Sequence, residues 1–173
     1  MRTIRTTLAA FGLAALSVTV PLSTAPSASA GTARFAGCNN EYNGQGGYEG
    51  DGKVHIYRDI NCANQIGNDI DNDSDWGDGS GDVKNATNMA SSVLNSGIRG
   101  GYDAVAFYDY TAYSWEYGFT CLKWSEFYAD DLTDNKFSKR TKGEDTGKAF
   151  TVNDAISSHK WVPESACGGI FVD

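Results

Sequence analysis

Aspartates are concentrated between Asn68 and Asp82, where their carboxylate oxygens could bind a cation. The run contains Asp69, Asp71, Asp73, Asp75, Asp78 and Asp82. An EF-hand calcium loop needs a glycine at its sixth position and a glutamate at its twelfth. Counted from Asp71, those positions hold Trp76 and Asp82, so the template fails. The run is therefore predicted to be a solvated acidic loop between strands.

The other reactive side chains form no recognisable catalytic set. His55 and His159 lie in strand-like segments, and neither belongs to a His-Glu-x-x-His zinc helix. The sequence has no Gly-x-Ser-x-Gly elbow and no phosphate-binding glycine loop. An acid–base pair such as Asp103 with Glu116 could act on a glycoside, but acidic residues are so abundant here that such pairs arise by chance. The chain is therefore predicted to be a binding protein and not an enzyme.

Residues 1–30 have the organisation of a secretory signal peptide. Arg2 and Arg5 precede an apolar run from Leu8 to Val20, and the small residues 28–30 (ASA) precede Gly31. The apolar run is too short to cross a bilayer, which takes roughly 20 apolar residues. We expect a secreted, extracellular and soluble chain of about 140 residues, which suits one domain.

The exported chain is strongly acidic. The whole sequence has a net charge of −8, and loss of Arg2 and Arg5 with the signal peptide lowers it to −10. Such a surface repels nucleic acid and anionic lipid at long range. We therefore expect no nucleic-acid partner and no membrane partner, and we expect a monomer.

Two stretches of the chain repeat one pattern, which predicts two structural motifs. Residues 54–57 (VHIY) lead to residues 88–92 (NMASS), and residues 105–108 (VAFY) lead to residues 154–158 (DAISS). The second copy is longer, and its highly charged insertion, Asp130 to Lys148, is interpreted as an exposed, mobile loop. The predicted domain covers residues 54–173, with repeat one at 54–100 and repeat two at 105–162.

The four cysteines after the signal peptide predict two disulfides. Their even number in an exported chain favours disulfides over metal ligation. Three connectivities exist for Cys38, Cys62, Cys121 and Cys167. Pairing Cys38 with Cys62 and Cys121 with Cys167 is favoured, because it keeps each bridge within or beside one repeat.

Short aromatic or β-branched segments separated by Gly, Asn and Asp predict an all-β sandwich or barrel. The expected strands are Val54 to Tyr57, Ala104 to Tyr108, Phe119 to Trp124, Phe150 to Val152 and His159 to Val162. The Gly- and Asn-rich segment 31–53 is predicted to be an irregular lead-in. Only Trp124 to Leu132 could support a helical turn or two.

The repeat resembles the βγ-crystallin superfamily. Its Greek-key motif opens with Tyr-x-x-x-x-aromatic-x-Gly, which Tyr108 and Tyr113 match, and closes with Asn/Asp-Asn/Asp-x-x-Ser/Thr-Ser, which residues 153–158 (NDAISS) match completely. The first copy is degenerate at three positions. Cys62 takes the place of the aromatic residue, and Asn64 takes the place of the glycine. Thr87 takes the first Asn/Asp position of the closing signature, residues 87–92 (TNMASS). The resemblance implies a βγ-crystallin-like Greek-key sandwich of two repeated motifs, stapled by disulfides.

The resemblance also implies possible ligands and partners. In calcium-binding members, hydroxyl, acidic or amide, and backbone oxygens surround the ion, a ligand set that calcium prefers. Transferred to this chain, Asp154 and Ser157 would form one calcium site, and Asn88 and Ser91 a weaker one. In the alternative interpretation, the Ser-Ser pairs only hydrogen-bond the folded hairpins.

The signal peptide, the cysteines and the signature strings together are similar to secreted bacterial peptidase inhibitors of metalloproteinase-inhibitor type. That similarity implies a rigid loop that blocks an extracellular protease, most readily a metalloprotease. Its contact would be Cys121 and Leu122, unless Leu122 is an inward strand residue and Cys121 only staples the fold. The alternative function is a non-inhibitory module that binds calcium, or a carbohydrate or cell-wall module of killer-toxin-like type, which outward-facing aromatic residues of 108–128 could serve.

Overall fold

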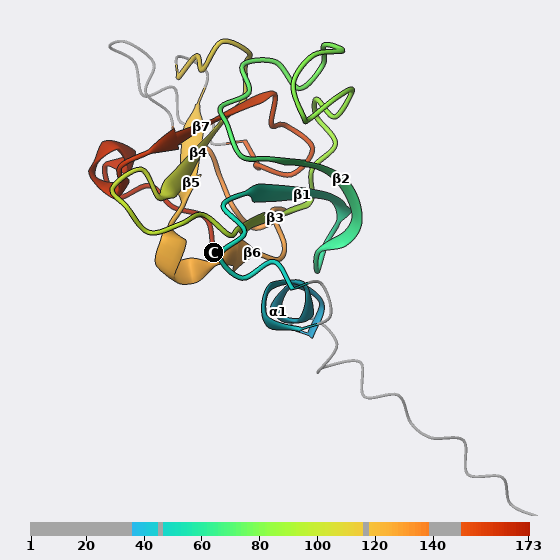
Figure 1. The fold of residues 1–173 in the computed structure, drawn as a ribbon. Helices are drawn as coiled ribbons and strands as arrows, with labels where there is room; N and C mark the ends of the chain where they lie inside the picture. The colour runs from blue at the N-terminus through green and yellow to red at the C-terminus, as the bar shows by residue number, and fades with distance from the viewer. Residues whose placement is uncertain (1–35, 45–46, 116–117, 139–149) are drawn as a thin grey trace, which may run out of the picture.

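The computed structural model describes residues 36–44, 47–115, 118–138 and 150–173. Two antiparallel sheets form the body of the molecule (Figure 1). The first has the strand order β2-β1-β3-β6 and the second β5-β4-β7. The strands of the first sheet are β1 (Val54–Asp59), β2 (Ala63–Asp69), β3 (Ser92–Asn95) and β6 (Tyr128–Ala129). Those of the second sheet are β4 (Ala104–Tyr108), β5 (Phe119–Leu122) and β7 (Ser158–Val162). The predicted all-β fold of two sheets is confirmed.

The two sheets are built by the same exchange of segments. In each, a central strand (β1 or β4) pairs with the next strand of its own half (β2 or β5) and with the last strand of that half (β3 or β7). Strand β6, from the second half, then extends the first sheet beside β3. The first half contributes Asp73 beside β7, where it forms an isolated bridge with His159. Each motif thus completes the sheet of the other, a Greek-key crossover that makes the halves interdependent.

The hydrophobic core lies between the sheets. Its largest members include Trp76, whose ring meets that of Phe107 edge-on at a centroid distance of 6.3 Å. Phe137 and Leu132, from the predicted insertion, are also buried in this core. The described first part of the insertion, Asp130 to Ser138, is therefore packed and not a free loop, which corrects that prediction, while residues 139–148 fall outside the described residues.

Both disulfides have the favoured pairing, Cys38–Cys62 and Cys121–Cys167. The first bridge joins the turn after β1 to α1 (Ala36–Asn43), a helix outside the sheets at the end near β6 (Figure 1). Tyr42 of α1 is buried beside Cys38. The prediction of an irregular lead-in is therefore wrong for this segment, because a disulfide and a buried tyrosine hold a helix that local propensity does not favour.

Four of the five predicted strands are present, with ends shifted by at most a few residues. The fifth, Phe150 to Val152, forms only a single bridge between Thr151 and Lys136. The predicted helical turn is a 3-10 helix, Trp124–Glu126. A second 3-10 helix, Glu164–Cys167, carries the last cysteine. Within the described residues, no helix is long and apolar enough to cross a membrane.

Candidate cation site between the two motifs

The two closing signatures meet each other across the molecule. The backbone N–H of Asn88 donates to the carbonyl of Ile156 at 2.9 Å, and the backbone N–H of Asp154 donates to the carbonyl of Ala90 at 2.9 Å. Asn88 and Asp154 occupy the same position of the two signatures, as do Ala90 and Ile156. The pair of bonds is therefore reciprocal, and each signature is held in place by the other.

Asn88 and Asp154 share an unusual backbone conformation. Their φ angles are 58° and 53°, in the left-handed region. Asparagine and aspartate tolerate this region better than other residues with a side chain. The conformation explains why the signature has Asn or Asp at this position, where each also supplies a side-chain oxygen. Asn64, at the position where the family motif has glycine, is left-handed as well, with φ 56°.

The two serines of each signature have different partners. The second serines bond to hairpins of their own halves: Ser92 Oγ donates to the carbonyl of Asp59 at 2.6 Å, and Ser158 Oγ donates to that of Tyr110 at 2.7 Å. The first serine of the second signature, Ser157, donates its Oγ hydrogen to Asn88 Oδ1 of the first signature at 3.3 Å. The predicted structural role thus belongs to the second serine, and Ser157 faces the other motif.

The structure pairs Ser157 with a different candidate ligand from the one that the sequence prediction gave it. That prediction combined Asp154 with Ser157 and Asn88 with Ser91. The observed hydrogen bond instead pairs Ser157 with Asn88. Asp154 contacts the first signature through its backbone N–H, which donates to the carbonyl of Ala90. Ala90 directly precedes the buried Ser91. The grouping differs because the motifs exchange segments, which a linear sequence does not reveal.

Two further aspartates adjoin these groups; the sequence predicts a solvated loop for Asp75 and does not single out Asp131. The backbone N–H of Trp76 donates to the carbonyl of Ser157 at 2.9 Å, and that of Leu132 donates to the carbonyl of Ser91 at 3.0 Å. Trp76 follows Asp75 and Leu132 follows Asp131. Each group therefore has an aspartate on the chain segment that crosses from the other half.

The oxygens at this interface suit a hard cation such as calcium. Beside the Asn, Asp and Ser oxygens, Thr87 Oγ1 and Asn153 Oδ1 at the first signature positions are buried without a hydrogen-bond partner. Unpartnered buried oxygens are unfavourable unless something satisfies them. Among the described residues, no three His, Cys, Asp or Glu side chains gather around one point. A cation would therefore depend on amide, hydroxyl and carbonyl oxygens with little carboxylate charge.

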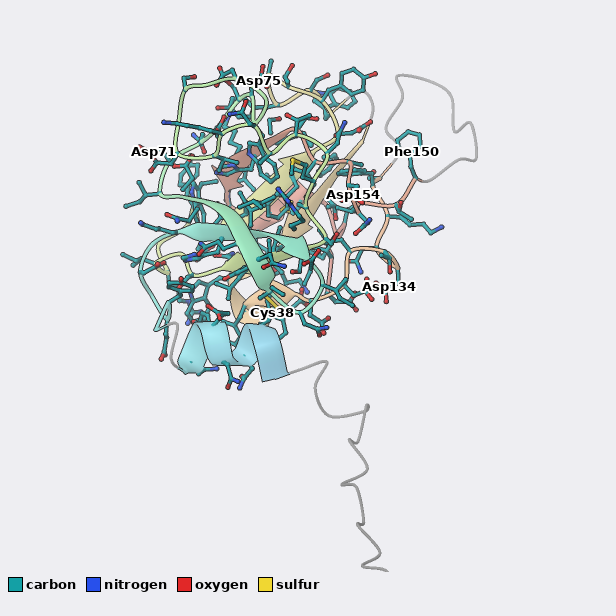
Figure 2. All side chains as sticks on the ribbon, turned by 90° about the vertical axis from the view of Figure 1, so that its right-hand side faces the viewer. Cys38, Asp71, Asp75, Asp134, Phe150 and Asp154 are labelled. Carbon is teal, nitrogen blue, oxygen red and sulfur yellow. A yellow bond between two sulfur atoms is a disulfide. The ribbon has the colours of Figure 1, made fainter. Side chains whose placement is uncertain are left out.

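Apart from Asp75, the acidic run is a different kind of structure from these groups. Asp69 and Asp73 are buried, which corrects the prediction of a wholly solvated loop, whereas Asp71 and Asp78 are exposed. Burial raises the pKa of Asp69 and of Asp73. Figure 2 shows Asp71 and Asp154 on opposite sides of the molecule. Asp71 is therefore remote from Asp154.

Both histidines are enclosed in hydrogen-bond networks. His159 accepts a hydrogen bond at Nδ1 from the Trp76 indole N–H at 2.9 Å, and its Nε2 lies 3.0 Å from the carbonyl of Asp71. Burial lowers the pKa of His159 to about 4. His55 lies between Asp51 and Gln65, at 3.0 and 2.9 Å, and burial lowers its pKa although Asp51 opposes the shift. Both side chains stabilise the fold, and neither presents a free nitrogen to solvent.

The predicted inhibitory contact is inaccessible. Leu122 and Cys121 both have 0 % of their surface exposed, and Leu122 belongs to the central core. A side chain without accessible surface cannot enter a pocket of another protein while the strand is folded. The alternative interpretation, an inward strand residue beside a stapling cysteine, describes the observed arrangement. Glu116, one member of the acid–base pair considered above, lies outside the described residues.

Comparison with known proteins finds similarity only at the level of solved structures. No protein-family model and no curated protein matches the chain. One similar structure comes from work on the evolution of the eye lens βγ-crystallin domain fold. It is 23% identical in sequence, the match covers 63% of this chain and 83% of that chain, and the TM-score is 0.41. Another is a βγ-crystallin from an archaeon that is 17% identical in sequence. That match covers 64% of this chain and 96% of the archaeal chain, with a TM-score of 0.36.

Proposed function

We propose that this protein is a secreted βγ-crystallin-like module that binds calcium where its two signatures meet. The reciprocal backbone bonds between Asn88 and Ile156 and between Asp154 and Ala90 carry the proposal, because they bring oxygen-bearing residues of both motifs together. One site would combine Asn88 with Ser157 and Asp75, and the other Asp154 with Ser91 and Asp131. Calcium would supply the positive charge that links the two motifs.

The affinity follows from the charge of the ligands. Calcium affinity increases with the number of carboxylates and with the rigidity of the site. Each proposed site has one or two carboxylates, with neutral oxygens for the rest. We therefore expect dissociation constants of about 0.1–1 mM, the range of extracellular calcium modules. At 10 mM calcium, binding at such a site stabilises the native state by about 1.5–3 kcal/mol.

Titration calorimetry with calcium tests this function. Asp154→Asn keeps the shape and tolerates the left-handed backbone, but it removes the charge, so it should weaken binding at its site by about tenfold. Asp71→Asn is the matched control, because Asp71 is an exposed aspartate remote from Asp154 (Figure 2). No binding by the unaltered protein at 10 mM calcium, or equal losses in both variants, would contradict the proposal.

Inhibition of an extracellular protease is a second candidate function. The buried Leu122 cannot be its contact. The observation that favours it is a different segment, the exposed loop between β3 and β4, whose two ends are bonded to one buried asparagine, Asn95. A protein that presents such a fixed loop could occupy a protease cleft at little entropic cost. Residual activity of a metalloprotease, a serine protease and a papain-like protease in its presence tests this function.

A further inference from the structure

The loop between β3 and β4 exposes large apolar side chains. Ile98 and Tyr102 are each 70 % exposed, more than any other large apolar residue of the described chain. Ile70, 56 % exposed, lies beside Ile98, since a Cβ added to Gly52 would meet the Cδ1 atoms of Ile98 and Ile70 at 3.6 and 3.8 Å. These three side chains border one surface hollow of about 450 Å³. Apolar surface gathered in this way marks a contact site.

A single buried side chain fixes both ends of this loop. Asn95 is fully buried at the end of β3. Its Oδ1 accepts a hydrogen bond from the backbone N–H of Gly97 at 2.9 Å, and its Nδ2 donates to the carbonyl of Asp103 at 2.8 Å. The same Nδ2 also donates to the carbonyl of Leu122 in β5, at 3.2 Å. Asn95 therefore ties the start of the loop, its end and the neighbouring sheet together.

Aromatic side chains fix the backbone immediately before Ile98. The Trp124 indole N–H donates to the carbonyl of Gly97 at 2.9 Å, and the Arg99 guanidinium lies 5.2 Å from the centroid of the Trp124 ring. Gly97 packs so closely on Trp161 that a Cβ there would approach the ring to 2.6 Å. The residues on both sides of Ile98 are thus held, while Ile98 itself projects into solvent.

We propose that residues 97–103 form an inhibitory loop that enters the substrate cleft of an extracellular endopeptidase, with Ile98 in an apolar specificity pocket. The proposal rests on the inhibitor function above and names its contact. A peptidase cleft takes a short peptide segment with each side chain in its own pocket, and a tethered loop with an exposed isoleucine can supply such a segment. Because its conformation is already fixed, the loop loses little entropy on binding. Anionic lipid is a poor occupant for so acidic a protein.

Asn95 is expected to act as a positioning residue. If a peptidase cut the loop, the Asn95 bonds to Gly97 and Asp103 would hold the new ends near each other. The cut chain would then leave the cleft slowly, and the loop would persist as an inhibitor instead of being consumed as a substrate. Loss of the asparagine should therefore convert inhibition into cleavage confined to residues 97–103, whereas a merely destabilised fold would be cut at many places along the chain.

Inhibition constants against thermolysin, subtilisin and papain test the loop. Ile98→Ser should weaken inhibition of the susceptible enzyme at least thirtyfold, as for other residues at the centre of an interface. Its melting temperature should change little, because Ile98 is mostly exposed. Phe150→Ser is the matched control, because Phe150 is also an exposed apolar residue, at 45 %. Asp71 borders the hollow, and Figure 2 shows Phe150 on the other side of the molecule from Asp71. That variant should inhibit like the unaltered protein.

Cleavage of the loop provides the second measurement. Asn95→Ser, incubated with the susceptible peptidase, should be cut within residues 97–103 while the unaltered protein stays intact, as mass spectrometry would detect. Inhibition that survives Ile98→Ser would overturn the loop proposal and leave the inhibitor function standing. Equal loss in the Phe150→Ser variant would also overturn it. Failure of the unaltered protein to inhibit all three enzymes would overturn both.

Discussion

Lowering the pH from 7 to 5 should destabilise the fold through His159. The side chain is fully buried, and its Nδ1 accepts the Trp76 indole N–H at 2.9 Å. A proton on Nδ1 would place two N–H donors against each other. Burial is the main cause that lowers the pKa of His159 from 6.5 to about 4, and the bond to the Asp71 carbonyl opposes it.

The size of the effect follows from the two pKa values. The unfolded chain binds a proton at His159 near pH 6.5, and the folded chain does so only near pH 4. The contribution of His159 to the free energy of unfolding is therefore complete above pH 6.5 and is lost as the pH falls toward 4. The whole difference corresponds to about 3 kcal/mol, of which about 2 kcal/mol is lost between pH 7 and pH 5.

Neighbouring groups determine where this effect can be measured. The Asp69 carboxylate lies 3.9 Å from His159 Nε2, and burial raises its pKa and that of Asp73. A raised carboxyl pKa favours the folded state as those groups become protonated at acidic pH, so it opposes the histidine effect there. His55, whose pKa is lowered, adds to the loss. Comparison of the unaltered protein with a variant that lacks His159 therefore separates the histidine contribution from that of the carboxyls.

Urea unfolding at pH 7 and pH 5 measures the change. His159→Gln retains an amide that can accept from Trp76 but does not titrate, so it should remove most of the difference between the two pH values. His55→Gln is the matched control, a second buried histidine whose replacement should leave most of the difference. Stability of the unaltered protein that differs by less than about 0.5 kcal/mol between the two pH values would refute the reasoning, as would a His159→Gln variant with an undiminished loss.

Three further outcomes are expected from the packing and the backbone. Leu122→Ala should lower the free energy of unfolding by about 3 kcal/mol in urea, because it leaves a cavity in a fully buried strand; a loss below about 1 kcal/mol would contradict its place in the core. The double change Cys121→Ser and Cys167→Ser should cost about 4 kcal/mol by the loop-entropy model for a separation of 46 residues, and unchanged melting under reducing conditions would argue against this bridge. Without calcium, Asp154→Ala should cost about 1 kcal/mol more than Asp154→Gly, because only alanine is strained at φ 53°; equal thermal stability of the two variants would exclude that conformation.

The sequence predicts the elements whose pattern is local. Strands β1, β4 and β7 combine β-branched and aromatic residues with flanking turn residues, so their positions are clear. Strand β2 is missed because it is an edge strand whose exposed residues are mostly polar, including Asn64 and Gln65. Helix α1 is missed because a disulfide to Cys62, distant in sequence, stabilises it.

The candidate site is predictable in its residues but not in their grouping. The signatures identify Asn88, Ser91, Asp154 and Ser157 from sequence alone. Their arrangement depends on the exchange of segments between the motifs, which the Trp76–Ser157 and Leu132–Ser91 backbone bonds record. The exposed loop 97–103 carries no sequence motif. Its distinguishing feature is the position of the Asn95 side chain, which only the folded structure provides.

The most direct test of the calcium site is a titration of the isotopically labelled protein with calcium, followed by amide chemical shifts. The proposed sites predict saturable shifts that are largest at residues 88–91 and 154–157 and at the crossing segments 75–76 and 131–132. The exposed acidic residues 78–82 should shift little, because they lie outside both groups. Shifts confined to the rest of the acidic run, residues 68–74 and 77–82, or no saturable shift at 10 mM calcium, would contradict the claim that the two motifs share calcium at their interface.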